Sequence, residues 1–246
     1  MSKFKSLLDP QEQQQGISCT LTQVPRELDK FIKKALRYLR GKIYCLTIEV
    51  FLPSDLMGTE IDRWKITGPK TDKITLGIQY PIRLRSLDRL KLSYLDLYWS
   101  QWCKYWERVR EILEHRPTQD LFEHLDKTEG FNWKLLKIKL KDKVGLKVTC
   151  AQPPSIKKDL FKAILYATTP VAIWTRTDIL NLGGVTAIDQ LLTCKPLCHL
   201  CESVRQVREQ ADAQTEEHLG LHLALLWENP YRLTPDVMVE FISPGQ

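Results

Sequence analysis

The stretch VGLKVTCAQPPSIKKDLFKAILYATTPVAIWTR, residues 144–176, decides the fold, because it predicts a strand, a helix and a second strand in immediate succession. Residues 144–150 alternate in character and are rich in β-branched side chains, as expected of a strand. Pro153 and Pro154 cannot continue a strand ladder, and Ser155 can cap the helix that follows.

The second half of this stretch predicts a helix and a buried strand. Apolar side chains recur at helical spacing, at Ile156, Leu160, Phe161, Ile164 and Leu165. Pro170 ends the helix, and the apolar run 171–174 is typical of a strand covered on both faces. Because a helical crossover joins parallel strands, we expect an α/β fold with a mixed, largely parallel central sheet flanked by helices.

Further strands are predicted at residues 42–52 and 221–227, and the second is expected to be parallel to its neighbours. Glu49 lies within the first of these apolar runs, which favours a paired structural carboxylate over a catalytic one. Arginines alternate with or follow apolar positions in the next strand and are expected to point outward, at Arg83, Arg85 and Arg89.

The remaining elements are mostly helical. A basic helix is predicted over residues 24–40, preceded by a flexible lead-in (1–23), so that residues 24–246 form a single domain. One long helix, or two helices, are predicted over residues 88–116, and three tryptophans share one face there, at Trp99, Trp102 and Trp106. That face is interpreted as a core stripe, with a groove for a partner as the alternative.

Composition limits the class of protein. The chain has 246 residues, 43% of them hydrophobic and 27% charged, with a formal net charge of +6. No apolar run approaches the roughly 20 residues of a membrane span, and the N-terminal residues lack the apolar core of a signal peptide. Seven cysteines, an odd number, suit a reducing compartment. We therefore expect a cytoplasmic protein without a membrane partner.

The sequence contains none of the common catalytic and cofactor-binding motifs. The sequence has no GxxxxGK[ST] or GxGxxG phosphate loop, no GxSxG elbow and no HExxH, so no catalytic residue, cofactor or metal is assigned. The segment CKPLCHLC carries zinc-type donors, but their spacing departs from that of paired zinc ligands. The sequence leaves zinc binding open at Cys194, Cys198, His199 and Cys201.

Two other function classes stay open. A metal-dependent nuclease or hydrolase would use acids near strand ends and would bring at least two of them together in a cleft. The candidates are Asp55, Asp62, Asp178 and Glu228. A nucleic-acid sensor would need the lysines of 134–147 and the arginines of 83–89 on one surface. The lysines themselves alternate with apolar residues after Lys137, as in a strand with one solvated face.

A tryptophan stands beside charged residues at three predicted strands, as Trp64 after Asp62 and Arg63, Trp174 before Arg176, and Trp227 before Glu228. If the three strand ends meet, these rings could wall a shared pocket or interface. The alternative is that they form the rim of the core.

The same segments resemble the C-terminal domain of vWA-MoxR-associated proteins (VMAP-C). The resemblance is carried by these segments, in chain order: Ile48–Pro53 with Leu56, Asp62 with Trp64, Tyr80–Ile82 with Arg85–Leu90, Trp99–Trp106, Thr169–Arg176 and His222–Asp236. These motifs occur in the expected order over about residues 25–240, nearly the whole chain.

This resemblance implies a cyanobacterial or actinobacterial conflict system with a role in antiviral defence. It also implies a non-catalytic scaffold that couples an effector, such as a protease, to a MoxR-type AAA ATPase and a vWA protein. No effector is visible before the matching part, so the chain either recruits one or is a fragment. No catalytic residue carries over. The expected partner-binding surface consists of Asp62, Trp64, Trp174, Arg176, Trp227, Glu228 and Arg232.

Overall fold

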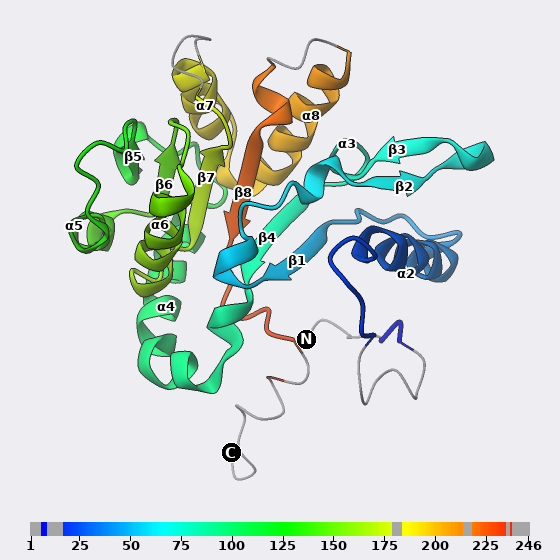
Figure 1. Ribbon diagram of the computed structural model, residues 1–246, viewed down its shortest axis with the longest axis horizontal. Coiled ribbons are helices and arrows are strands. Elements are labelled where there is room, and N and C mark those ends of the chain that lie inside the picture. The colour runs from blue at the N-terminus through cyan, green and yellow to red at the C-terminus, as the bar shows by residue number, and fades with distance from the viewer. Residues whose placement is uncertain (1–5, 9–16, 179–183, 214–217, 235–236, 238–246) are drawn as a thin grey trace.

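The computed structural model describes residues 6–8, 17–178, 184–213, 218–234 and 237 (Figure 1). Its centre is a six-stranded sheet made of β1 (Ile48–Leu52), β4 (Ile82–Ser86), β5 (Phe122–Leu125), β6 (Gly145–Val148), β7 (Val171–Thr175) and β8 (Leu223–Trp227). In space the strands follow the order β1-β4-β8-β7-β6-β5. A separate antiparallel hairpin is formed by β2 (Lys65–Thr67) and β3 (Lys73–Thr75).

The sheet consists of two parallel halves that run in opposite directions. Strands β1, β4 and β8 are parallel to one another, as are β5, β6 and β7. The halves meet where β7 and β8 pair antiparallel. The predicted α/β fold with a mixed, largely parallel sheet is confirmed.

The prediction that residues 221–227 add a strand parallel to the βαβ unit is wrong in one respect. Strand β8 is parallel to β4 but antiparallel to β7, with Thr175 opposite Leu223 and Val171 opposite Trp227. Thr175 at the end of β7 is the register partner of Leu223 at the start of β8. The chain therefore leaves β7 and enters β8 at the same end of this strand pair. Strand β8 must therefore run back along β7.

Seven helices accompany the sheet in the described part of the chain. They are α2 (Val24–Leu39), α3 (Leu76–Gln79), α4 (Leu92–Ile112), α5 (Trp133–Lys139), α6 (Pro154–Tyr166), α7 (Gly184–Thr193) and α8 (Leu200–Asp212). One apolar core unites α5 and α6 with one face of the sheet, and a second unites part of α4 with α7 and α8 on the other. Helix α2 occupies the segment expected for the basic helix.

The βαβ unit of residues 144–176 forms as predicted. Strands β6 and β7 pair in parallel, from Gly145 opposite Val171 to Val148 opposite Trp174, and α6 joins them. Every residue of both strands is buried. A continuous apolar run in sequence therefore corresponds to a strand covered on both faces.

Residues 133–142 form helix α5 and a short 3-10 turn, which corrects the interpretation of the lysine cluster as a strand. Asn132 starts this helix, because its side-chain oxygen accepts hydrogen bonds from Lys134 N (2.9 Å) and Leu135 N (3.2 Å). Lys147 belongs to β6 instead and is buried against Asp189 of α7.

The tryptophan stripe of α4 is largely core. Trp102 and Trp106 are buried, and Trp99 is half-buried with its ring edge-to-face against Trp102 (centroids 6.1 Å apart). The core interpretation of this face is confirmed. Most of the predicted lead-in, residues 1–5 and 9–16, lies outside the described residues.

Candidate functional site

Two buried arginine–carboxylate clusters connect elements that are distant in the sequence. The first, called the Asp62 cluster, consists of Asp62, Arg176 and Arg208. Asp62 lies on a short 3-10 turn between β1 and β2. Arg176, directly after β7, places both terminal nitrogens on the carboxylate, with Nη1 donating to Oδ2 at 3.1 Å. Arg208 of α8 forms an ion pair with the same oxygen (Nε to Oδ2, 3.6 Å).

The Asp62 cluster has more positive than negative charge. Two guanidinium groups share one carboxylate, and the side chains of all three residues are at most 8% exposed. Burial lowers the pKa of Arg208, and the charge of Asp62 opposes this shift. Arg208 also donates from Nη2 to Leu223 O (2.9 Å), which fixes α8 to the start of β8.

Gly77 of α3 allows this arrangement to pack. A Cβ at position 77 would lie 2.7 Å from Asp62 Cβ and 2.9 Å from Asp62 O, closer than real contacts permit. Helix α3 therefore covers Asp62 because residue 77 has no side chain.

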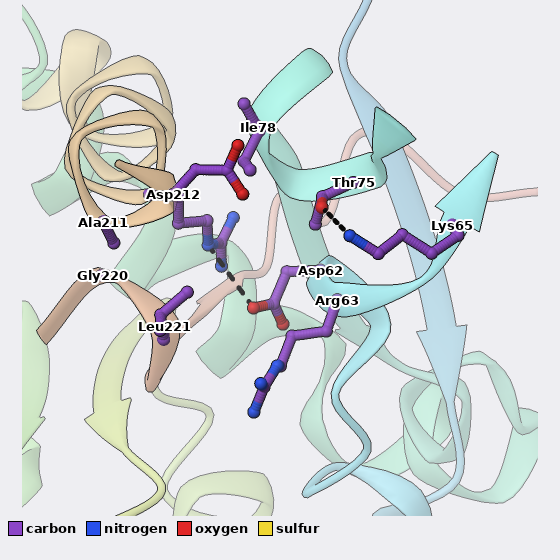
Figure 2. Close-up of a pocket in the computed structure, with 10 residues that line it drawn as sticks. Asp62, Arg63, Lys65, Thr75, Ile78, Ala211, Asp212, Gly220 and Leu221 are labelled. Atoms are coloured by element: carbon purple, nitrogen blue, oxygen red, sulfur yellow. Dashed lines mark hydrogen bonds and ion pairs between the residues drawn. The ribbon is translucent and has the colours of Figure 1, made fainter. Parts of the chain in front are cut away.

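A cavity of about 360 Å³ lies beside this cluster, between the β2–β3 hairpin and α8 (Figure 2). It is lined by Asp62, Arg63, Lys65, Thr75, Ile78, Arg208, Ala211, Asp212, Gly220 and Leu221. Lys65 Nζ donates to Thr75 Oγ1 (2.6 Å) across the hairpin. Three basic and two acidic residues face a space without a His, Cys or Ser, so these ten residues offer charge recognition rather than a nucleophile paired with a base.

The second cluster, called the Glu228 cluster, consists of Glu228, Arg85, Arg89, Glu49 and Arg232. Glu228 follows β8 directly and is fully buried. Its Oε1 accepts a hydrogen bond from Ser86 N (2.6 Å) and lies 3.5 Å from Arg89 Nε, and its Oε2 lies 3.3 Å from Arg85 Nε. Its main-chain oxygen accepts from Trp102 Nε1 (3.0 Å).

Arg85 links Glu228 to Glu49 and to the segment after β8. Its Nη1 lies 3.2 Å from Glu49 Oε2 and 2.6 Å from Arg232 O, and its Nη2 donates to Asn229 O (2.6 Å). Glu49 also pairs with Arg83 (3.4 Å) and with the side chain of Arg232 (3.3 Å). The paired structural role predicted for Glu49 is confirmed.

The prediction that Arg83, Arg85 and Arg89 point outward is wrong. Arg85 and Arg89 have side chains only 1% exposed, and Arg83 is 18% exposed with its Nε 3.0 Å from Cys201 Sγ. Strand β4 does alternate, but α8 and the segment after β8 cover its second face. Arg85 and Arg89 are therefore unavailable for the continuous basic surface that a nucleic-acid sensor of the predicted kind would need.

The three strand-associated tryptophans do not share a pocket. Trp174 lies opposite Ala224 and Trp227 opposite Val171, so the two rings occupy opposite ends of the β7–β8 pair. They also belong to different cores, and both are at most 4% exposed. Trp64 is half-buried against the first core. The antiparallel direction of β8 separates rings that a parallel strand would have brought together.

The predicted surface residues thus divide between the two clusters and the cores. The structure brings Asp62 to Arg176, and it brings Glu228 to Arg232 through Arg85 and Glu49. Sequence reasoning did not select Arg208, because an arginine in a polar helix carries no local signal of burial. Glu49 did carry one, as a charged residue within an apolar strand.

The strand-end acids do not converge. Asp62 and Glu228 belong to separate arginine clusters, and Asp55 and Asp178 are exposed. Cys194 is exposed, Cys198 lies 3.7 Å from Glu114, and Cys201 is buried against Arg83. Within the described residues, no three His, Cys, Asp or Glu side chains are placed to hold a metal ion.

The fold and these clusters define a mixed α/β domain whose sheet is held together by buried arginine–carboxylate contacts. The chain belongs to the vWA-MoxR associated protein C-terminal domain family, VMAP-C, whose model matches residues 5–230. The name of this family associates its members with vWA and MoxR proteins. No curated protein and no solved structure matches the chain. Among the described helices, none combines the length and apolar character needed to cross a bilayer.

Proposed function

We propose that this protein is a non-catalytic scaffold of a bacterial conflict system, which couples an effector to an NTP-driven complex of a MoxR-type ATPase and a vWA protein. The single observation that carries this proposal is the family match over residues 5–230. The scaffold would act in the cytoplasm, and the effector, such as a protease, would be recruited by protein–protein contact.

The two clusters support the non-catalytic part of this proposal, because their carboxylates are buried and paired within the chain. Their carboxylates are engaged by arginines through hydrogen bonds and ion pairs and are at most 13% exposed. Such contacts stabilise one arrangement of the sheet.

Co-purification tests this proposal. The tagged full-length chain is expressed with the MoxR ATPase and the vWA protein encoded in the same genome, and complexes are measured by size-exclusion chromatography with light scattering. We expect a complex whose stability differs between ATP and ADP, and an unrelated AAA ATPase should not enter it. If the chain binds neither protein, whether ATP or ADP is present, the scaffold role is refuted.

A further inference from the structure

Within the part of the chain that the structure describes, the outer edge of β1 and the segment that leads into it have no backbone pairing. Strand β1 is the outermost strand on the side of α2 (Figure 1), and no described strand pairs with its outer edge. Ile48 N donates to Pro81 O (2.9 Å). In this parallel ladder the backbone N–H and C=O groups of Ile48, Val50 and Leu52 therefore point toward β4. The N–H and C=O groups of Glu49 and Phe51 therefore point to the outer edge.

The segment before β1 would lengthen this edge. Residues 43–47 (IYCLT) lie outside any described helix, strand or turn, although their composition strongly favours a strand. Ile43 is fully exposed and Tyr44 is 47% exposed. Their backbone groups appear in no main-chain hydrogen bond of the described residues. An exposed edge of this kind is a template for another strand.

A basic groove adjoins this edge. Tyr44 and the end of α2 line a cavity of about 430 Å³ together with Lys33, Arg37 and Arg40. Lys33 is paired with Asp29 (2.8 Å), whereas Arg37 and Arg40 are exposed and have no ion-pair partner among the described residues. Lys42 next to them lies over the Tyr38 ring (4.0 Å) rather than on a carboxylate.

A partly apolar floor continues from this groove. Tyr44, Cys45 and Leu46 line a cavity of about 710 Å³ with Ile32 and Leu36 of α2 and with the β2–β3 hairpin. Its charged lining residues are paired with one another, as Lys33 with Asp29 and Arg205 with Glu202. A strand added to the outer edge of β1 would place alternate side chains toward this floor, while its backbone would satisfy the free groups of β1.

We propose that residues 43–51 form a docking edge for an extended, acidic segment of a protein partner, which adds to the sheet as a seventh strand beside β1. The unpaired charges of Arg37 and Arg40 select the acidic occupant. A second copy of this chain would bring the same cations to the same edge, and their repulsion disfavours self-pairing. This inference rests on the proposed scaffold function, since it assigns the surface on which a partner binds.

The test measures binding of the MoxR ATPase and of the vWA protein to the full-length chain by biolayer interferometry. One variant, Thr47→Pro, removes a backbone N–H that would face the outer edge, and Thr47→Ala is its matched control. A second variant, Arg37→Glu with Arg40→Glu, reverses the charge of the groove. Its control is Lys141→Glu with Lys158→Glu, two exposed lysines far from β1 in sequence.

We expect each edge variant to weaken binding of one partner by at least about tenfold, whereas both controls stay within about twofold. A common thermal midpoint would show that all four variants are folded. If the partner binds every variant alike, the docking edge is refuted and the scaffold role stands. If neither protein binds the unmodified chain, both the docking edge and the scaffold role are refuted. A dimer of this chain that Thr47→Pro dissociates would identify the occupant as a second copy and overturn the acidic partner.

Discussion

Glu228 and Ser86 are 142 residues apart in sequence, yet the Glu228 carboxylate accepts a 2.6 Å hydrogen bond from the Ser86 backbone N–H. This contact joins the end of β8 to the end of β4, where Arg85 and Arg89 also reach the same carboxylate. One buried acid therefore fixes the carboxyl ends of two central strands and compensates the charge of two buried arginines.

Glu228→Gln should strongly destabilise the protein. The substitution preserves shape but removes the charge that Arg85 and Arg89 face, and breaking a buried ion pair in this way costs about 3–5 kcal/mol. Urea unfolding followed by tryptophan fluorescence measures the loss. The control is Glu209→Gln, because Glu209 is 58% exposed and pairs with Arg205 at the surface, where about 1 kcal/mol or less is expected. Equal effects of the two substitutions would contradict the central role of Glu228.

The Asp62 cluster should show strong coupling between its members. In a double-mutant cycle of Asp62→Asn and Arg176→Gln, we expect a coupling free energy of about 1–3 kcal/mol, because the two side chains share a buried bidentate contact. The same cycle between Asp62→Asn and Lys65→Gln should give less than about 0.5 kcal/mol, since Lys65 is exposed and donates to Thr75. If the changes in the free energy of unfolding caused by Asp62→Asn and Arg176→Gln are additive, Arg176 does not hold Asp62.

Tyr94 should make the free energy of unfolding depend on pH in the alkaline range. Burial raises the pKa of Tyr94, and its hydroxyl donates to Leu165 O (2.8 Å). Because the pKa is higher in the folded state, this contribution is fully present below the ordinary tyrosine pKa of about 10. It is lost as the pH rises above that value, when the unfolded tyrosine ionises.

Tyr94→Phe tests this dependence. Near neutral pH the variant should be less stable by about 1 kcal/mol, since one hydrogen bond is lost. The difference between the two proteins should shrink above about pH 10. Urea unfolding across this range, with the exposed Tyr38→Phe as control, measures the effect. A difference that stays constant with pH would exclude Tyr94 as the titrating group.

The thiols should react in an order set by burial. Cys19, Cys45 and Cys194 are exposed, whereas Cys150 and Cys201 are buried, and burial raises the pKa of both buried thiols. Since the thiolate is the reactive form, a short pulse of iodoacetamide should label the three exposed cysteines first. Mass spectrometry of the digested protein gives the order. Early labelling of Cys201 would mean that α8 does not cover Arg83 and β4.

Much of the fold follows from local pattern. The run 144–176 carries a strand, two prolines, an amphipathic helix and a second apolar run, and this order allows only a parallel crossover. Strand β5 and helix α5 were harder to predict, because segments as short as 122–125 and 133–139 take their structure from the neighbours on which they pack.

By itself, the sequence determined the α/β class, the βαβ unit, the core role of the α4 tryptophans and the pairing of Glu49. Only the tertiary structure decided the direction of β8 against β7, and with it the separation of Trp174 from Trp227. It also decided that Arg85, Arg89 and Arg208 are buried. The physical reason is that alternation reveals which side chains share a face, whereas what covers that face depends on segments distant in the chain.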